Sequence, residues 1–315
     1  MIEVDNLSKR YGDKLAVDSL SFTVKPGVVT GFLGPNGAGK STTMRMIIGL
    51  DRPSSGHVRV NGRPYARHTA PLQEVGALLE AKAVHPGRSA YNHLLALAAS
   101  NGIGKQRVDE VIDMVGLAEV ARKRAGGFSL GMGQRLGIAS ALLGDPQTVM
   151  LDEPVNGLDP EGVLWIRNLL KNLAEDGRTV FVSSHLMSEM ALIAEDLIVI
   201  GRGRLLSAGP ISDFIGRASS RSVRVRSPHA AHLRGLLMGD GVTVTGGEAG
   251  LLEVTGLEAA EIGERAAGAG LVLHELAVRE ASLEEAFMEL TRDAVEYQAT
   301  TSVSASLVTT ERSGR

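Results

Sequence analysis

A glycine-rich loop between an apolar run and a helical pattern constrains the fold of this chain more than any other feature. The loop reads GPNGAGKST from Gly34 to Thr42 and fits the spacing G-x-x-x-x-G-K-[ST]. The run VVTGFLG leads into it, and STTMRMIIGL continues from it with helical spacing. A strand, loop and helix joined in this way are typical of a parallel sheet covered by helices. We therefore predict an α/β fold.

The loop is suited to hold phosphate groups. Its glycines let consecutive backbone N–H groups curl round phosphate oxygens, and the following helix aims its positive end at the same place. Lys40 would reach the β- and γ-phosphates of a nucleotide, and Ser41 would ligate Mg²⁺. The alternative is a glycine-rich turn without a ligand, which the agreement of strand, loop and helix disfavours. The residues expected to line the site are Gly34, Pro35, Asn36, Gly37, Ala38, Gly39, Lys40, Ser41 and Thr42.

Two further apolar runs, TVMLDEP from Thr148 and TVFVSSH from Thr179, end in polar residues. Ligands of open α/β sheets bind where such strands end. Asp152 would hold Mg²⁺ through water. Glu153 would act as the general base for an attacking water, an effect typically of about 10²–10⁴ in rate. His185 could donate to the γ-phosphate. The alternatives are a carboxylate pair that caps a helix and an ordinary surface or core histidine.

The composition limits the class of protein. A chain of 315 residues exceeds what one hydrophobic core usually covers, so two domains are expected. The net charge of -3 gives no electrostatic case for nucleic-acid binding. The absence of cysteine excludes disulfides and thiolate metal sites and fits a cytosolic protein. We expect neither a signal peptide nor a membrane span, because no run of about 18 apolar residues occurs. The excess of Arg over Lys favours a bacterial source.

The pattern of alternating strands and helices changes after LIVIGRGRLLSAGP, which we interpret as a hairpin. From Ser222 the order of patterns is β-α-β-β-α-β, that of a ferredoxin-like unit, and SLEEAFMELTRD follows as a final helix. We predict one domain over residues 1–216 and a C-terminal accessory α+β domain over residues 217–293. The Ser/Thr-rich tail, residues 294–315, is expected to be disordered.

Together these motifs resemble the ATP-binding subunits of ABC transporters, over about Ile2 to Gly216. GPNGAGKST looks like the Walker A loop, and VMLDEP like Walker B with its catalytic glutamate. NGLDP at Asn156–Pro160, which includes Asp159, resembles the nucleotide-contacting D-loop, and His185 resembles the switch histidine. Tyr11 stands where the family stacks an aromatic ring on adenine, although it could instead be an edge-strand aromatic. The resemblance implies a P-loop NTPase fold, an ABC ATPase cassette with an antiparallel β subdomain and a helical subdomain, using ATP and Mg²⁺.

The stretch FSLGMGQR falls where this family has its signature, L-S-G-G-Q-x-Q-R. In the family, two subunits pair head-to-tail, and each ATP lies between one phosphate loop and the other subunit's signature. Ser129 and Gly131 match the signature serine and its second glycine, whereas Leu130 and Met132 replace the first glycine and the glutamine. The resemblance therefore implies that Ser129 and Gly131 contact ATP. The alternative is a serine-capped helix with no ligand.

Glu80 is a second departure from the family pattern. It stands where the family usually has the glutamine that contacts Mg²⁺ and water and links to the membrane subunit. A carboxylate there can still ligate Mg²⁺, and it adds a negative charge near the triphosphate. We expect tighter Mg²⁺ dependence, with an ordinary solvated loop residue as the alternative.

The resemblance implies an ATPase subunit that powers a separately encoded permease from the cytoplasmic face of a bacterial membrane. One full set of motifs favours a homodimer with two ATP molecules at its interface. Residues 222–293 resemble the C-terminal extension of the drug- and antibiotic-export branch, which implies drug or antibiotic efflux. The alternatives are a soluble ABC ATPase acting on ribosomes or nucleic acid, and a nucleotide-binding regulator without turnover. Glu153 argues against the regulator.

Overall fold

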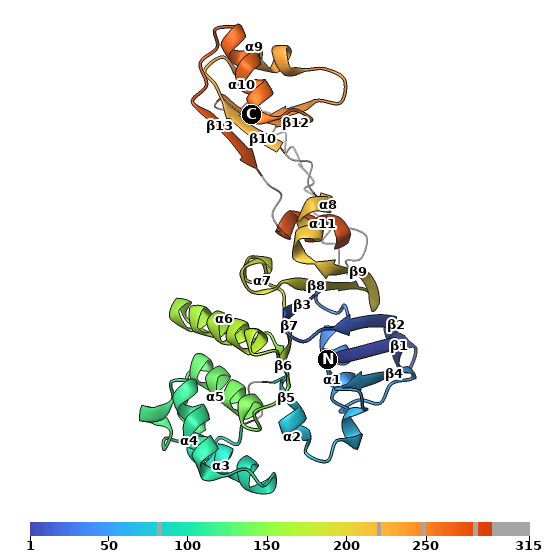
Figure 1. Ribbon diagram of the computed structural model, residues 1–315, viewed down its shortest axis with the longest axis vertical. Coiled ribbons are helices and arrows are strands. Elements are labelled where there is room, and N and C mark those ends of the chain that lie inside the picture. Colours follow the sequence, from blue (N-terminus) through green and yellow to red (C-terminus); the bar gives the residue numbers. More distant parts are fainter. Residues whose placement is uncertain (81–83, 219–221, 247–249, 280–282, 292–315) are drawn as a thin grey trace, which may run out of the picture.

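The computed structural model describes residues 1–80, 84–218, 222–246, 250–279 and 283–291. They form a large domain, which contains two sheets and the helices α1–α8, and a small domain, which contains a third sheet (Figure 1). The predicted tail, residues 294–315, lies outside the described residues. No helix in the described residues combines the length and the apolar character needed to cross a bilayer.

The first sheet of the large domain is antiparallel and has the order β2-β1-β4. Its strands are β1 (Ile2–Tyr11), β2 (Lys14–Val24) and β4 (Ser55–Val60). The second sheet has the order β5-β6-β7-β3-β8-β9, in which only β9 runs antiparallel to its neighbour. Its strands are β3 (Val29–Leu33), β5 (Val75–Leu78), β6 (Thr148–Asp152), β7 (Thr179–Ser184), β8 (Asp196–Gly201) and β9 (Arg204–Pro210). The predicted hairpin is β8–β9.

The central parallel strands are buried along their whole length because both faces of the sheet are covered. Every residue of β3 and β7 is buried, as expected for strands with apolar side chains on both faces. Between the two sheets, the rings of Phe22, Phe32 and Phe181 pack with centroids 5.0–6.0 Å apart. This contact fixes β3 and β7, and therefore the loops at their carboxyl ends.

The helices of the large domain fall into two groups. Helices α3, α4 and α5 pack together at the bottom of Figure 1, and α5 also packs on β5 and β6. This group is the predicted helical subdomain. The helices are α1 (Lys40–Ile47), α2 (Pro71–Glu74), α3 (Ala90–Ser100), α4 (Lys105–Met114), α5 (Leu130–Leu142), α6 (Pro160–Glu175), α7 (Met187–Ile193) and α8 (Ile211–Ala218). Short 3₁₀ turns are η1 (Tyr65–Arg67), η2 (Ala118–Val120) and η3 (Ala125–Gly127).

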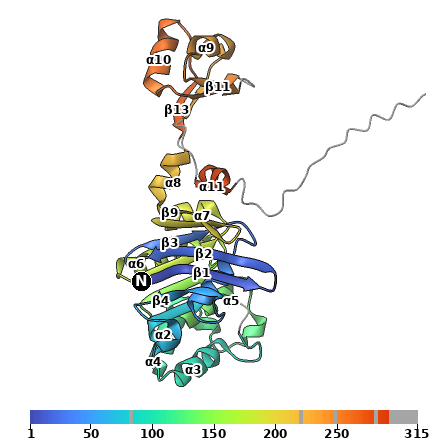
Figure 2. The same cartoon turned by 90° about the vertical axis from the view of Figure 1, so that its right-hand side faces the viewer.

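The small domain has the element order β-α-β-β-α-β and its own core. Its antiparallel sheet has the order β11-β12-β10-β13. Val225, Leu252 and Val254 of the sheet pack with Leu233 of α9 and Ile262 of α10. The elements are β10 (Ser222–Arg226), α9 (Ala230–Leu237), β11 (Thr243–Gly246), β12 (Leu251–Thr255), α10 (Ala259–Gly268) and β13 (Glu275–Arg279). Figures 1 and 2 show it standing clear of the two large-domain sheets.

The last helix, α11 (Leu283–Thr291), differs from the predicted domain division. It packs on α7 and α8 of the large domain, whereas the division at residue 217 placed it in the accessory domain. Leu283 and Phe287 share one apolar cluster with Phe214 of α8 and with α7. Leu283 and Phe287 are four residues apart and therefore form one apolar face of α11. Since β13 is the last strand of the small-domain sheet, this face packs on the large domain instead.

Candidate active site

The phosphate loop lies between the end of β3 and the start of α1. Gly39, at the N-cap of α1, has a φ of 101°, and a Cβ there would lie 2.7 Å from the carbonyl oxygen of Ala16. Only glycine fits this position. Lys40 is buried, and its Nζ donates to the carbonyl oxygens of Gly34 at 2.6 Å and Pro35 at 3.3 Å. The ammonium group is therefore held across its own loop.

The charge of Lys40 is balanced by two carboxylates. Burial lowers the pKa of Lys40, and the charges of Glu153 and Asp152 oppose that shift. A nucleotide phosphate beside the ammonium group would, like these two carboxylates, favour the charged form of Lys40. The loop, the buried cation and the start of α1 thus fit a polyphosphate.

Asp152 joins the phosphate loop to the ends of β6 and β7. Ser41 Oγ donates to Asp152 Oδ2 at 2.8 Å, and Ser183 Oγ donates to Asp152 Oδ1. Hydroxyl and carboxylate oxygens are the ligands that Mg²⁺ prefers, together with waters and substrate phosphates. In the described part of the chain no three acidic or histidine side chains gather into a metal cage, and Mg²⁺ does not require one. Ser41 and Asp152 therefore fit an Mg²⁺ that is completed by phosphate and water.

Glu153 and His185 face each other across the ends of β6 and β7. His185 Nδ1 lies 2.7 Å from Glu153 Oε2. The backbone of Glu153 has a φ of 52°, which few residues with a side chain adopt. Its N–H donates to the carbonyl oxygen and Oγ of Ser183 at 3.2 and 3.1 Å, and its carbonyl oxygen accepts from Gln134 Nε2 at 3.2 Å. These bonds hold the carboxylate beside His185, so Glu153 does not cap a helix.

The signature stretch begins α5. Ser129 is the N-cap of this helix, and its Oγ accepts a hydrogen bond from the Met132 N–H at 3.2 Å. A Cβ on Gly131 would lie 2.9 Å from the carbonyl oxygen of Gly157, so packing against the NGLDP loop already favours a glycine there. Met132 packs on the core beneath the helix. The two expected ligand residues therefore also have structural roles within one copy of the chain.

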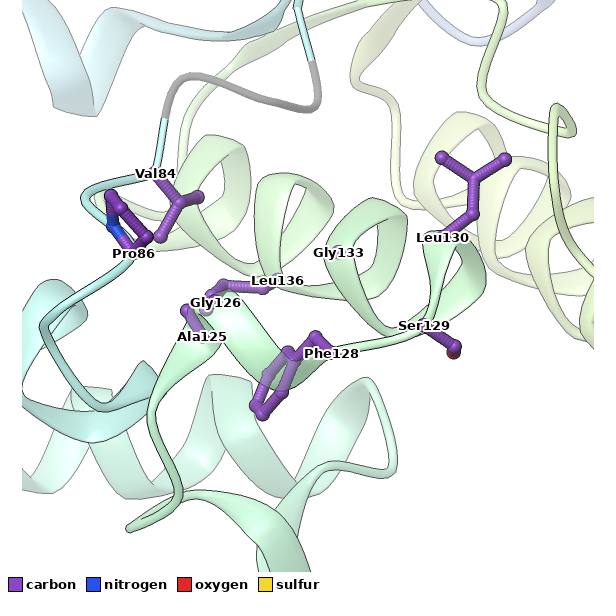
Figure 3. A pocket seen from close by; sticks show the side chains of 9 residues that line it. All are labelled: Val84, Pro86, Ala125, Gly126, Phe128, Ser129, Leu130, Gly133 and Leu136. Carbon is purple, nitrogen blue, oxygen red and sulfur yellow. The ribbon is translucent and has the colours of Figure 1, made fainter.

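A pocket of about 310 Å³ lies beside the signature (Figure 3). Val84 and Pro86 form one wall, and the start of α5 with the preceding turn forms the other. Its lining residues are Val84, Pro86, Ala125, Gly126, Phe128, Ser129, Leu130, Gly133 and Leu136. The lining is largely apolar, so this pocket is suited to contact with another protein more than to phosphate binding.

Three predicted site residues lie at the margin of the site. Tyr11 is 48% exposed at the end of β1, and its hydroxyl donates to Asp51 Oδ2 at 2.9 Å, which leaves ring surface for stacking. Asp159 caps α6 by accepting from the Gly162 N–H at 2.9 Å. Glu80 is exposed and follows β5 closely.

Two residues that serve the site were missed in the sequence. Ser183 was noted only as part of the SSH stretch, and its hydroxyl contacts both carboxylate residues. Gln134 lies within FSLGMGQR, but nothing in that stretch indicates its bond to the Glu153 carbonyl oxygen. For Ser183 the available signal was its position two residues before His185 on a strand next to β6.

Comparisons with known proteins identify the family of this chain. Residues 17–156 match the family described as ABC transporter. The chain is 41% identical over 216 residues to the uncharacterized ABC transporter ATP-binding protein YhcH of Bacillus subtilis, an alignment that covers 68% of this chain and 71% of that protein. This chain belongs to the ABC transporter ATP-binding proteins. Another relative within this family, the bacitracin transport ATP-binding protein BcrA of Bacillus licheniformis, is 42% identical over 67% of this chain and 70% of that protein.

Solved structures of ABC cassettes share the fold of the large domain. An ATP-binding subunit of an ABC transporter superposes with a TM-score of 0.64 at 26% identity, covering 69% of this chain and 92% of that one. A dimeric cassette in a post-hydrolysis state, bound to ADP and Pi, gives 0.61 at 25% identity, covering 67% and 98%. Residues 221–284, which include the small domain, match a family described as a domain of unknown function (DUF8746).

Proposed function

We propose that this ABC ATP-binding protein hydrolyses ATP in a head-to-tail homodimer and so powers a separately encoded permease that exports an antibiotic or a similar compound. The observation that carries the proposal is the joint placement of Ser41, Asp152, Ser183, Glu153 and His185 at one sheet edge. ATP is the substrate, and Mg²⁺, held by Ser41 and Asp152, neutralises phosphate charge when bound.

Glu153 acts as the general base in this proposal. Its carboxylate takes a proton from the attacking water while the water oxygen bonds to the γ-phosphorus. The bond from that phosphorus to the β–γ bridging oxygen breaks, and the products are ADP and phosphate. His185, 2.7 Å from Glu153, orients the carboxylate and donates to the γ-phosphate. Lys40 contacts the β- and γ-phosphates.

The site is completed by a second copy of the chain. Ser129 is exposed at the start of α5, so its hydroxyl and the helix N-terminus can meet an ATP held by the phosphate loop of the other copy. Gly131 lets that backbone come close, Asp159 lies in the adjoining loop, and Tyr11 stacks on adenine. The dimeric post-hydrolysis cassette supports a dimer as the working form.

The proposed cargo class rests on relatives. Besides the bacitracin transport protein, they include the lantibiotic transport ATP-binding protein SrtF of Streptococcus pyogenes, 34% identical over 65% of this chain and 89% of that protein. The linearmycin resistance ATP-binding protein LnrL of Bacillus subtilis is 35% identical over 71% and 73%. These names favour an exporter subunit over an ATPase that acts on ribosomes or nucleic acid.

The permease would hold the protein at the cytoplasmic face of the membrane. We place its contact in the apolar pocket between Val84 and α5, because the family links to its membrane subunit through the segment at Glu80. Co-expression of a permease from the same gene neighbourhood should yield a complex on affinity purification. Phe128→Arg, which places a charge in the pocket, should abolish that complex while ATP binding persists.

Glu153→Gln tests the catalytic part. ATP turnover should fall by about 10²-fold or more, since a general base contributes that much. Because the Glu153→Gln variant keeps the phosphate loop and would still bind ATP, a dimer should accumulate with ATP and Mg²⁺ and elute early in gel filtration. Turnover equal to that of the unmodified protein would show that another group is the base.

A further inference from the structure

A second polar hollow lies away from the phosphate loop, at the edge of the three-stranded sheet. β4, labelled in Figure 1, forms that edge, and the residues that line the hollow come from β4, from the turn after it and from η1. Its volume of about 590 Å³ is in the usual range for small-molecule sites. The lining residues are His57, Val58, Arg59, Gly62, Arg63, Pro64 and Arg67. None of them belongs to the nucleotide site or to the apolar pocket at α5.

The residues that line the hollow include three arginines and no acidic residue. Arg59, Arg63 and Arg67 are exposed, and none of them forms an ion pair within the residues that the structure describes. Other arginines do pair with acids; Arg45, for example, pairs with Asp51 at 2.8 Å. Three guanidinium groups around one hollow present about fifteen N–H donors, at five per arginine, with no acceptor among them.

The acids of the neighbouring strand β1 leave this excess in place. Asp5 pairs with His57 at 3.5 Å. Glu3 is opposite Arg59 in the β1–β4 register, yet the two side chains do not approach to ion-pair distance. Of the four basic lining residues, His57, Arg59, Arg63 and Arg67, only His57 therefore has a carboxylate at ion-pair distance among the described residues.

The turn that carries Arg63 is held in one conformation. Asn61 and Gly62 have φ values of 50° and 80°, as in a two-residue hairpin turn. Val60 and Arg63 exchange backbone hydrogen bonds of 2.8 and 3.1 Å across it. The Asn61 side chain accepts from Thr148 Oγ1 at 3.0 Å and donates to Glu74 Oε2 at 2.9 Å, so the turn is anchored to the large sheet.

The segment that carries Arg67 is fixed onto the same turn. The ring of His68, only 4% exposed, makes a hydrogen bond of 2.9 Å from Nε2 to the Val60 carbonyl oxygen. Tyr65, at the start of η1, packs against the core between the two sheets. The backbone positions of all three arginines are therefore set before any ligand arrives, which lowers the entropy lost on binding.

We propose that this hollow binds a phosphate-bearing anion with two or more negative charges. Guanidinium groups match phosphate oxygens with paired hydrogen bonds, and their attraction grows with the ligand's charge. A hollow of about 590 Å³ exceeds one inorganic phosphate and suits a diphosphate or a phosphomonoester headgroup. The anion is either soluble or part of a lipid, and the same three arginines would hold both.

Calorimetric titration with inorganic pyrophosphate, without Mg²⁺, tests the site. Pyrophosphate should bind at two places, the phosphate loop and the hollow. Lys40→Ala should remove the first binding event and leave the second. The pair Arg63→Gln and Arg67→Gln should raise the dissociation constant of the second event roughly tenfold or more. A matched pair of exposed cations in the helical region, Lys123→Gln with Arg124→Gln, should change neither event.

Vesicle co-sedimentation separates the two sources of anion. Binding to vesicles that contain phosphatidic acid, but not to vesicles of phosphatidylcholine alone, and its loss in the Arg63/Arg67 variant would assign a lipid headgroup. Pyrophosphate binding without vesicle binding would assign a soluble anion. The proposal is overturned if the Arg63/Arg67 variant binds both probes as tightly as the unmodified protein. That result would leave the ATPase proposal intact, because the latter rests on the event removed by Lys40→Ala.

Discussion

At the scale of single residues, the catalytic geometry depends on Ser183. Its Oγ donates to Asp152 and accepts from the backbone N–H of Glu153, whose φ of 52° needs such support. Ser183→Ala should lower kcat about tenfold, because the backbone N–H of Glu153 and the carboxylate of Asp152 each lose a hydrogen bond to the Ser183 hydroxyl. Loss of the buried hydrogen bonds should also reduce the free energy of unfolding by roughly 1–3 kcal/mol. ATPase assays and urea unfolding measure the two effects.

Thr148→Val is the matched control for Ser183. It also removes one buried hydroxyl, at the opposite end of β6, where Thr148 Oγ1 donates to Asn61. Its stability should fall by a similar amount, roughly 1–3 kcal/mol, with kcat unchanged. If both variants lose kcat equally, Ser183 acts only through general stability.

The charge of Glu80 is expected to lower the Mg²⁺ concentration that ATPase activity requires. Asp51 is the main group that raises the pKa of Arg45, and Glu80 adds a smaller effect in the same direction, so its charge reaches the flank of α1. Glu80→Gln removes that charge, and half-maximal ATPase activity should then need several-fold more Mg²⁺. Glu119→Gln, another exposed acid on η2, should leave the Mg²⁺ curve unchanged. If the Mg²⁺ curves of Glu80→Gln and the unmodified protein superimpose, Glu80 is an ordinary solvated loop residue.

At the scale of elements, the start of α5 combines a structural role with an expected role in ligand binding. Ser129 caps the helix, and its exposure leaves the same hydroxyl open to a ligand. Ser129→Arg should abolish dimer-dependent ATP turnover, because a long cation would occupy the space meant for phosphate. Losing the cap should also cost about 1 kcal/mol of stability.

Ser89→Arg separates these two effects. Ser89 caps α3 with a hydrogen bond from the Asn92 N–H of 3.2 Å, the same length as the Ser129 bond. This variant should lose a similar stability and keep its turnover. Full turnover in Ser129→Arg would mean that FSLGMGQR is only the start of a helix.

The elements of the large domain were predictable because motif and periodicity pointed to the same fold. The strands that lead to Gly34, Asp152 and His185 are largely apolar, and the structure places them side by side as β3, β6 and β7. The hydrogen bonds of Ser183 and Gln134 were not predictable, since neither side chain has a spacing rule that names its partner. Their roles depend on strand register and on the depth of α5, which only tertiary packing fixes.

At the scale of the whole molecule, the position of α11 differs most from what the sequence predicts. The pattern SLEEAFMEL predicts an amphipathic helix, but not which surface its apolar face will cover. In the structure α11 follows the small domain and returns to α7 and α8 (Figure 2). α7 begins two residues after His185. Helix α11 thus packs against the helix that follows His185.

Phe287 provides the test of this packing. It is 8% exposed and packs with Phe214 in the large-domain core, so Phe287→Ala should cost about 3 kcal/mol of stability. For a domain of this size, that corresponds to a fall in Tm of roughly 6–12 °C. Met288→Ala is the matched control, because Met288 is 65% exposed on the same helix and its removal should leave Tm within about 1 °C. The transition to follow is the one that added ATP and Mg²⁺ shifts, since it reports the large domain. If Phe287→Ala leaves that transition in place, α11 contributes nothing to the large domain, even though it lies against α7 and α8.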